Sequence, residues 1–252
     1  MIINRSFKEF KLQHRSKKNQ IIYSSKKVKS DKEVLNLIDN FLIEKNSFIF
    51  ESVEKGKIKG RYTIFGKNPD KIWEFNNNNS FLIKNNKKVK LKEKPQILIE
   101  NIIEDFKFKI PSGLPSIASL ISGYFSYDTI RYIENIPNKC KDDLKVPDVR
   151  LLRPRILVIH DNLKKKIFYI VNIFKDEKIS NYPKKYLVIK SDLSKLFTQS
   201  LKAKDKTTNE KKLAKINVKS NTSKNKFLGM VNKAKKYIKI GDIFQVVLSQ
   251  RF

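Results

Sequence analysis

The sequence is poor in residues that define several common classes of protein. Its 252 residues include one cysteine and two histidines, which excludes an internal disulfide framework, a cysteine-cluster zinc site and a histidine-rich metal site. No apolar run approaches the roughly 20 residues that a membrane-spanning helix needs. The opening segment also lacks the apolar core of a secretory signal. We therefore expect a cytoplasmic protein that does not span a membrane.

Acidic residues are scarce as well. The chain has 25 Asp+Glu against 55 Lys+Arg, a formal net charge of +30, which often indicates a nucleic-acid partner. Lysine outnumbers arginine 47 to 8, however, whereas nucleic-acid readers rely on arginine. The lysines are scattered, and the abundant Asn and Ile share their A/T-rich codons. This composition favours a biased genome and a solvated surface, so we expect no nucleic-acid partner; polyanion binding stays open as the alternative.

The common catalytic motifs are also missing, since the sequence contains no Walker loop and no GxGxxG, GxSxG or HExxH pattern. Cys140 lies in a polar stretch without an evident base, which does not favour a nucleophile. Asp142, Asp143 and Asp148 do not have EF-hand spacing, so they predict a solvated loop. His160 ends an apolar strand and predicts a structural residue at its rim.

The apolar residues that are present alternate between helix and strand periods. Ser30-Asp31-Lys32-Glu33 predicts a capping box that starts a helix, and helical spacing recurs over 95–108 and 182–198. Strand patterns occupy 47–53, 61–66, 71–75, 80–85 and 87–91, a buried strand lies within 118–128 before a short helix, and a hairpin joins 155–161 to 166–174. The predicted fold class is α+β, with mixed or antiparallel sheets and flanking helices.

The composition changes after residue 198. Residues 199–223 are polar and lysine-rich, which predicts a linker. Beyond them, apolar residues recur on one helical face, Gly241 fits the position that follows the helix, and residues 242–252 predict a strand with an exposed edge. We therefore divide the chain into a domain over 1–198, a linker over 199–223 and the start of a second domain over 224–252.

One local feature indicates binding. Glu51 and Ser52 follow an apolar strand and precede Gly56, Gly60 and Arg61. Glycines allow close approach of the backbone, and the charges could meet the ammonium and carboxylate of a zwitterion. An ordinary hairpin closed by a Glu51–Arg61 ion pair explains the same residues, and spacing alone leaves both readings open.

Four blocks of the sequence resemble the large subunit of anthranilate synthase, in the chorismate-utilising enzyme family. The family patterns are an "ES…GRYS…G…P" block, a "GYxxYDxxRxxE…P" block, a "PD…P…v.D" block, and the helix and strand that open the chorismate-binding half. The matching stretches are FIFESVEKGKIKGRYTIFGKNPDKIWEF, GYFSYDTIRYIENIP, DDLKVPDVRLLRPRILVIHDNLKKKIFYI and FLGMVNKAKKYIKIGDIFQVVLSQRF. They cover residues 45–175 and 226–252 in the family's order.

The segment Gln245-Val246-Val247-Leu248 separates the branches of this family. Aminodeoxychorismate synthases more often read QVNL here, and isochorismate and salicylate synthases usually carry a lysine at the position of Gln245, where it activates water. Glutamine cannot act as that base, which agrees with ammonia as the nucleophile. The resemblance therefore favours anthranilate synthase, with aminodeoxychorismate synthase component I as the alternative.

The resemblance implies that chorismate and ammonia give anthranilate and pyruvate, the first step of tryptophan biosynthesis. Magnesium would hold the substrate carboxylates, and a glutamine amidotransferase subunit would supply the ammonia. Gln245 would lie near the substrate. Glu51 and Ser52 would line a site for L-tryptophan as feedback inhibitor.

The resemblance also implies that much of such an enzyme lies outside this sequence. Family members are about twice as long, with the magnesium ligands, the catalytic histidine and most chorismate contacts beyond the position of Phe252. We therefore expect an amino-terminal part of anthranilate synthase component I, cut off before most of the chorismate-binding domain and inactive alone. A non-catalytic tryptophan-binding regulatory module is the second hypothesis.

Overall fold

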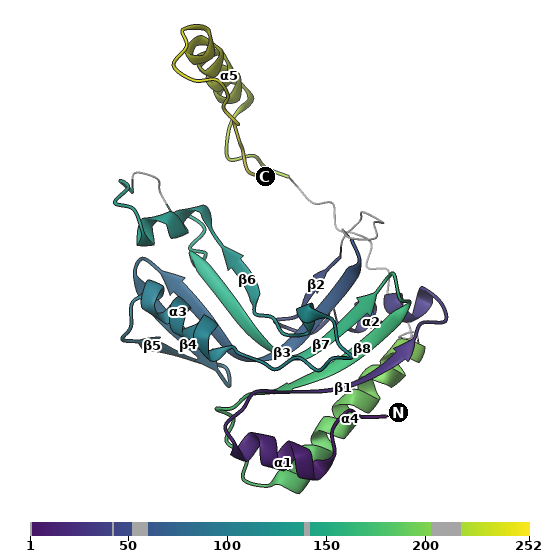
Figure 1. Cartoon of the computed structure of the whole chain (residues 1–252). Coiled ribbons are helices and arrows are strands. Elements are labelled where there is room, and N and C mark those ends of the chain that lie inside the picture. The colour runs from purple at the N-terminus through teal and green to yellow at the C-terminus, as the bar shows by residue number, and fades with distance from the viewer. Residues whose placement is uncertain (1, 42, 52–59, 139–141, 203–217) are drawn as a thin grey trace. The chain divides into compact units, whose positions relative to one another are not determined.

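The structure is a computed structural model of the whole chain, and it describes residues 2–41, 43–51, 60–138, 142–202 and 218–252. The chain divides into two compact units, Met1–Asp205 and Lys206–Phe252. The first unit contains a sheet with flanking helices, and the described residues of the second form one helix with its flanking segments (Figure 1).

The first unit is built on one antiparallel sheet of eight described strands, in the order β1-β8-β7-β3-β4-β5, with β2 also paired to β3 and β6 to β7. The strands are β1 (Gln20–Lys27), β2 (Phe48–Phe50), β3 (Tyr62–Asn76), β4 (Asn79–Lys84), β5 (Lys87–Leu91), β6 (Ser122–Phe125), β7 (Val149–Asp161) and β8 (Lys166–Ile173). The predicted strands 61–66 and 71–75 are one continuous strand, because an irregularity between Pro69 and Lys71 absorbs the break in the pattern.

The long strands β3 and β7 belong to two half-sheets. In the first half-sheet, residues 64–66 of β3 pair with β2, and residues 156–161 of β7 pair with β8, which pairs with β1. In the second, residues 72–76 of β3 pair with β4, which pairs with β5, and residues 149–152 of β7 pair with β6. Of the strands that the structure describes, only β3 and β7 run through both half-sheets (Figure 1).

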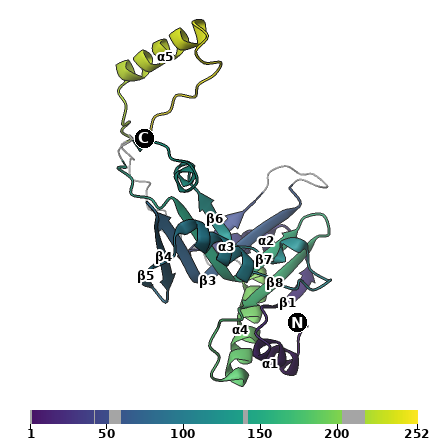
Figure 2. The ribbon, with the colours of Figure 1, turned by 60° about the vertical axis from the view of Figure 1, so that its left-hand side comes forward.

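Helices cover the first half-sheet on one face (Figure 2). α1 (Phe7–Arg15), α2 (Lys32–Phe41) and α4 (Tyr182–Leu201) pack their apolar residues on Phe65, Val158 and Tyr169. The segment around the 3-10 helix Ser116–Ala118 covers the opposite face, where Leu157, Ile159 and Phe168 are buried. Burial on both faces explains the continuous apolar run in β8.

The second half-sheet packs against α3 (Pro95–Asp105), which buries Ile102 against Trp73 and Phe75. α3 ends before the predicted residue 108, because Phe108 forms an isolated parallel bridge with Asn19. The predicted short helix after β6 is a 3-10 helix, Tyr127–Tyr132.

Two local predictions in the first half-sheet need correction. Glu33 does reach back at the start of α2, but its carboxylate accepts from the backbone N–H of Lys29 at 3.2 Å and pairs with Lys26 at 2.5 Å. His160 is not a rim residue. It pairs with Thr63 and Ile167 inside the sheet and is only 3% exposed, because neighbouring strands flank β7 on both sides there.

The second unit contains α5 (Lys224–Lys239), capped at its start by Ser223. At its end, Gly241 has φ +83°, and the N–H groups of Gly241 and Asp242 donate to the carbonyls of Ile238 and Tyr237. This is the Schellman pattern that the prediction for Gly241 requires. α5 has no buried residue.

The predicted strand over 242–252 does not form. Residues 243–252 have no regular secondary structure, and the side chain of Phe244 is fully exposed. A strand needs a neighbour to accept its backbone hydrogen bonds, and in the described part of this unit only Asn221 meets this segment through backbone groups, at Arg251. Across the described residues of the chain, no helix is both long and apolar enough to cross a bilayer.

Candidate functional site

The predicted binding residue Glu51 lies at the end of a short edge strand. β2 stops at Phe50, which pairs with Ile64 of β3, and the following Glu51 is exposed. Gly66 allows this arrangement, since a Cβ there would lie 2.2 Å from the ring of Phe48. The ring of Phe48 packs over that glycine. Ser52, the other predicted residue, lies outside the described residues.

Arg61 does not pair with Glu51. Its Nε and Nη2 donate to the two carboxylate oxygens of Asp161 at 3.1 and 2.7 Å, so the hairpin alternative is wrong in its ion pair. Asp161 also accepts from the backbone N–H groups of Leu163 and Lys164. Burial alone would raise the pKa of Asp161, but the Arg61 and backbone hydrogen bonds outweigh it and lower the pKa. This carboxylate therefore stays ionised.

Further contacts fix the chain on both sides of this ion pair. Asn162 donates its backbone N–H to the carbonyl of Arg61 at 2.9 Å, and its side chain reaches Thr63 Oγ1 at 3.4 Å. Gly60 takes φ +75°, a conformation that favours glycine. The Arg61 guanidinium lies 4.9 Å from the ring centre of Tyr62. Residues 60–63 and 160–162 thus form a defined base beside Glu51.

His160 lies in this base with its ring buried. Neither ring nitrogen has a hydrogen-bond partner among the described residues. Burial, with a contribution from Lys165, lowers the pKa of His160. The ring is therefore neutral at physiological pH.

A second cluster centres on Asp148, for which the sequence predicted only a solvated loop. Its carboxylate accepts from the Tyr132 hydroxyl at 2.8 Å and from the backbone N–H of Asn77 at 3.0 Å. Its backbone pairs with Phe75 and Ser126. Asp148 belongs to the "PD" block and Tyr132 to the "GYxxYDxxRxxE" block, so the structure joins two blocks that lie apart in the sequence. The predicted solvated loop is therefore wrong for Asp148, which is half-buried, whereas Asp142 is exposed.

A cavity of about 510 Å³ borders this cluster, with Asp128, Arg131 and Asp142 among its lining residues. The Arg131 guanidinium donates from Nε to the carboxylate of Asp128 at 2.8 Å and from Nη1 to the carbonyl of Ile136. Within the described ranges, no group of three or more His, Cys, Asp or Glu side chains could hold a metal ion.

The predicted substrate-side residue Gln245 lies in the second unit, on the irregular segment after α5, and is exposed. Glu51 belongs to the first unit. Gln245 and Glu51 therefore belong to different units of the chain.

Comparison with known proteins identifies relatives of this chain in sequence and in fold. Anthranilate synthase component 1 of Acetivibrio thermocellus is 34% identical over 244 residues, which are 94% of this chain and 49% of that relative. The protein of the same name from Cereibacter sphaeroides is 28% identical over 98% of this chain and 50% of its own length. The chain thus spans about half the length of the curated relatives it matches.

The crystal structure of anthranilate synthase component I from Streptococcus pneumoniae TIGR4 shares the fold, with a TM-score of 0.58 and 24% identity over 79% of this chain and 43% of that chain. The predicted α+β class is confirmed. A family model described as chorismate binding enzyme matches residues 45–252. Because that match covers most of the sequence, this chain belongs to the chorismate binding enzyme family.

Proposed function

We propose that this chain is the amino-terminal part of an anthranilate synthase component I. The main support is the coverage of two relatives of that name. Their matches extend over 94% and 98% of this chain but over only 49% and 50% of the relatives' own lengths. The Arg61–Asp161 pair supports the proposal, since it connects the "GRYS" block to the "v.D" block through side chains. The domain division at 1–198, 199–223 and 224–252 remains part of the proposal.

The reaction proposed for the whole enzyme is chorismate plus ammonia giving anthranilate, pyruvate and water. Gln245 would face the substrate and, unlike a lysine, could not deprotonate a water nucleophile. We assign the Mg²⁺ ion no ligand in this chain. The ammonia would come from a glutamine amidotransferase subunit, and the setting would be the cytoplasm.

We propose further that Glu51 and Ser52 bind L-tryptophan as a feedback inhibitor. Arg61 is occupied by Asp161, and Glu51 makes no ion pair with any other described residue, so its exposed carboxylate can accept the ammonium of an amino acid. A ligand that binds only the folded state raises the melting temperature with concentration. This property makes the site testable without catalysis.

The test of the effector site is a thermal-shift titration of the full chain with L-tryptophan. We expect the melting temperature to rise for the wild type and the rise to disappear in Ser52→Ala and Glu51→Gln. D-Tryptophan and L-phenylalanine serve as ligand controls, and Lys27→Ala, an exposed change on β1, serves as the protein control. A flat wild-type titration would refute the effector proposal.

The test of catalysis is anthranilate fluorescence after incubation of the chain with chorismate, ammonium and Mg²⁺. We expect no product, because only Gln245 among the proposed substrate contacts lies in this sequence. Product formation by the chain alone would contradict our assignment. A tryptophan response without catalysis would also agree with the second candidate, a regulatory module; adding a separately produced carboxy-terminal half of a relative and measuring anthranilate distinguishes the two.

A further inference from the structure

The two half-sheets meet at a seam where backbone pairing is weak. At the seam, Pro69 of β3 lies opposite Pro154 of β7, and proline has no N–H to donate. Asn68 has φ +51°, outside the extended region. The register also shifts between Pro69 and Lys71. The ladder between the two long strands is therefore interrupted at this point.

The outer strands do not bridge the seam. Along β7, pairing with β6 ends at Leu152, and pairing with β8 begins at Ile156. On the other side, β2 pairs with β3 as far as Gly66, and β4 begins at Ile72. Among the described strands, only β3 and β7 cross from one half-sheet to the other, and they do so where their own hydrogen bonding is poorest.

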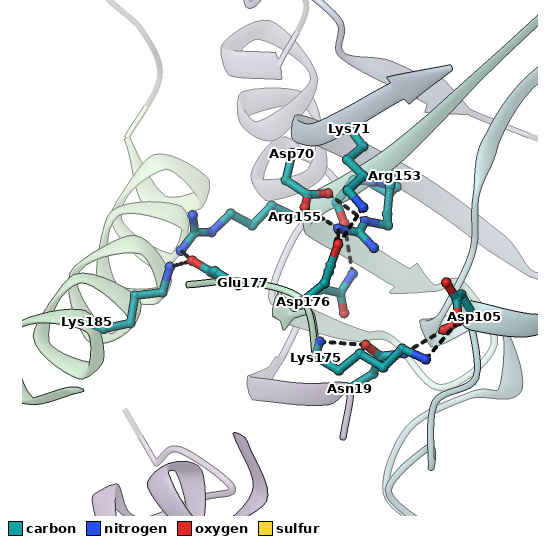
Figure 3. Close-up of polar contacts among 12 residues, drawn as sticks. Asn19, Asp70, Lys71, Asp105, Arg153, Arg155, Lys175, Asp176, Glu177 and Lys185 are labelled. Atoms are coloured by element: carbon teal, nitrogen blue, oxygen red, sulfur yellow. Dashed lines mark hydrogen bonds and ion pairs between the residues drawn. The ribbon is translucent and has the colours of Figure 1, made fainter. Parts of the chain in front are cut away.

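Side chains span this gap (Figure 3). Arg153 of β7 donates from Nε to Asp70 at 2.7 Å and from Nη2 to Asp176 at 2.9 Å. Asp70 lies at the bulge of β3, whereas Asp176 follows β8 of the first half-sheet. The Arg153 guanidinium also lies 3.9 Å from the ring centre of Phe174, and the residue is only 8% exposed. Its Nε and Nη2 groups thus reach Asp70 at the seam and Asp176 in the segment after β8.

A second ion pair connects β3 to the segment after β8: the Nζ of Lys71 lies 2.5 Å from the carboxylate of Asp176. Burial alone would raise the pKa of Asp176, but the Lys71 hydrogen bond and the charge of Arg153 lower it. The cluster of Arg153, Lys71, Asp70 and Asp176 is balanced in charge. Each charge of the cluster therefore has an opposite charge as its partner.

The segment that carries Asp176 is anchored to the first half-sheet. Glu177 pairs with Lys185 of α4 and lies 3.6 Å from Arg155. Lys175 pairs with Asp105 at the end of α3, which packs on the second half-sheet. The polar contacts drawn in Figure 3 therefore hold the segment after β8 on one side and reach across the seam on the other.

We infer that the seam is a hinge between the two half-sheets and that Arg153 is the clamp that holds it at one angle. This device goes beyond the proposed function and does not depend on it. Opening the clamp would leave both half-sheets folded but would free their relative orientation, because each half-sheet keeps its own strand pairs and its own helix layer.

The inference is tested by distances between spin labels in the full chain. Labels at Lys27→Cys on β1 and Lys90→Cys on β5 report across the seam, in a Cys140→Ser background; both lysines are exposed. A second pair, Lys90→Cys with Glu100→Cys on α3, reports within the second half-sheet. We expect Arg153→Met to broaden the first distance distribution and shift its mean, and to leave the second unchanged.

The matched control is Arg61→Met, which removes another bidentate arginine–aspartate pair, between the residue just before β3 and the last residue of β7, at the end of one half-sheet. It should leave both distributions unchanged. Should Arg153→Met fail to fold, Asp176→Asn replaces it, because it cuts the link to the first half-sheet while Arg153 keeps Asp70. An unchanged 27–90 distribution in a folded clamp variant, or equal broadening in Arg61→Met, would overturn the inference.

Discussion

The two half-sheets share β3 and β7 yet differ in how deeply they are buried. The first has three helices on one face and the segment around Ser116–Ala118 on the other, so Phe65, Leu157 and Tyr169 have no exposed surface. The second has α3 on one face, and Phe125 at its edge is 57% exposed. Equally apolar residues are buried or exposed according to the layers around them, which decides how much each contributes to stability.

The largest expected effect compares phenylalanines from the two half-sheets. Phe65→Ala removes a fully buried ring that contacts Phe41 edge-on at 5.6 Å, and it should lower the free energy of unfolding by about 3–5 kcal/mol. Phe125→Ala should change it by no more than about 0.5 kcal/mol. Urea denaturation followed by circular dichroism measures both. Equal losses would show that the half-sheets do not differ in burial as described.

An intermediate effect compares two glycines that lie against a neighbouring strand. A Cβ at Gly123 of β6 would lie 2.0 Å from the carbonyl oxygen of Arg150, a backbone atom, whereas a Cβ at Gly66 of β3 would meet the Phe48 side chain. Side chains move more easily than a paired backbone. Gly123→Ala should therefore cost about 1–3 kcal/mol, and Gly66→Ala less; a larger loss for Gly66→Ala would contradict this explanation.

The matched control for the glycine pair is Gly229 in α5, where an added Cβ meets open space. Gly229→Ala should leave the unfolding of the first unit unchanged and should raise the helicity of the second, because alanine favours a helix over glycine by about 1 kcal/mol. Far-UV circular dichroism measures that helicity.

The smallest expected effect is a pH dependence in the first half-sheet. Burial lowers the pKa of His160 from 6.5, so between the folded and unfolded pKa values the unfolded chain binds more protons and stability rises with pH. Stability should therefore fall as the pH drops below about 6.5. His160→Leu should flatten the profile in that window and leave the more acidic loss, which comes from Asp161, in place. An unchanged profile would refute the assignment.

Much of the fold followed from local pattern. The hairpin of β7 and β8, the strands β4 and β5 and the helices α3, α4 and α5 were expected near their observed bounds, because apolar periodicity reports which side of an element is buried. The missed features involve distant residues. The continuity of β3 through Pro69 depends on β7, which pairs with it on both sides of the irregularity.

Less of the candidate site than of the fold could be predicted from the sequence. Glu51 could be singled out, but Asp161 as the partner of Arg61 could not, since the two residues lie 100 positions apart. The "v.D" block did show an aspartate at the end of a predicted strand, but the sequence did not indicate that Arg61 is the partner of this residue. The Asp148 cluster was missed for the same reason, as its hydrogen bonds to Tyr132 and Asn77 depend on the pairing of β3, β6 and β7.

The sequence alone was sufficient to predict the α+β class and the helix end at Gly241 and to recognise the family blocks, because these depend on neighbouring residues and on their spacing. Tertiary structure alone decided that Arg61 pairs with Asp161, that His160 is buried, and that Arg153 links two half-sheets. It also decided against a strand after α5, although those residues have strand-like side chains. The physical reason is common to all four: ion pairs, burial and strand hydrogen bonds require a partner, and only the folded chain brings the partner near.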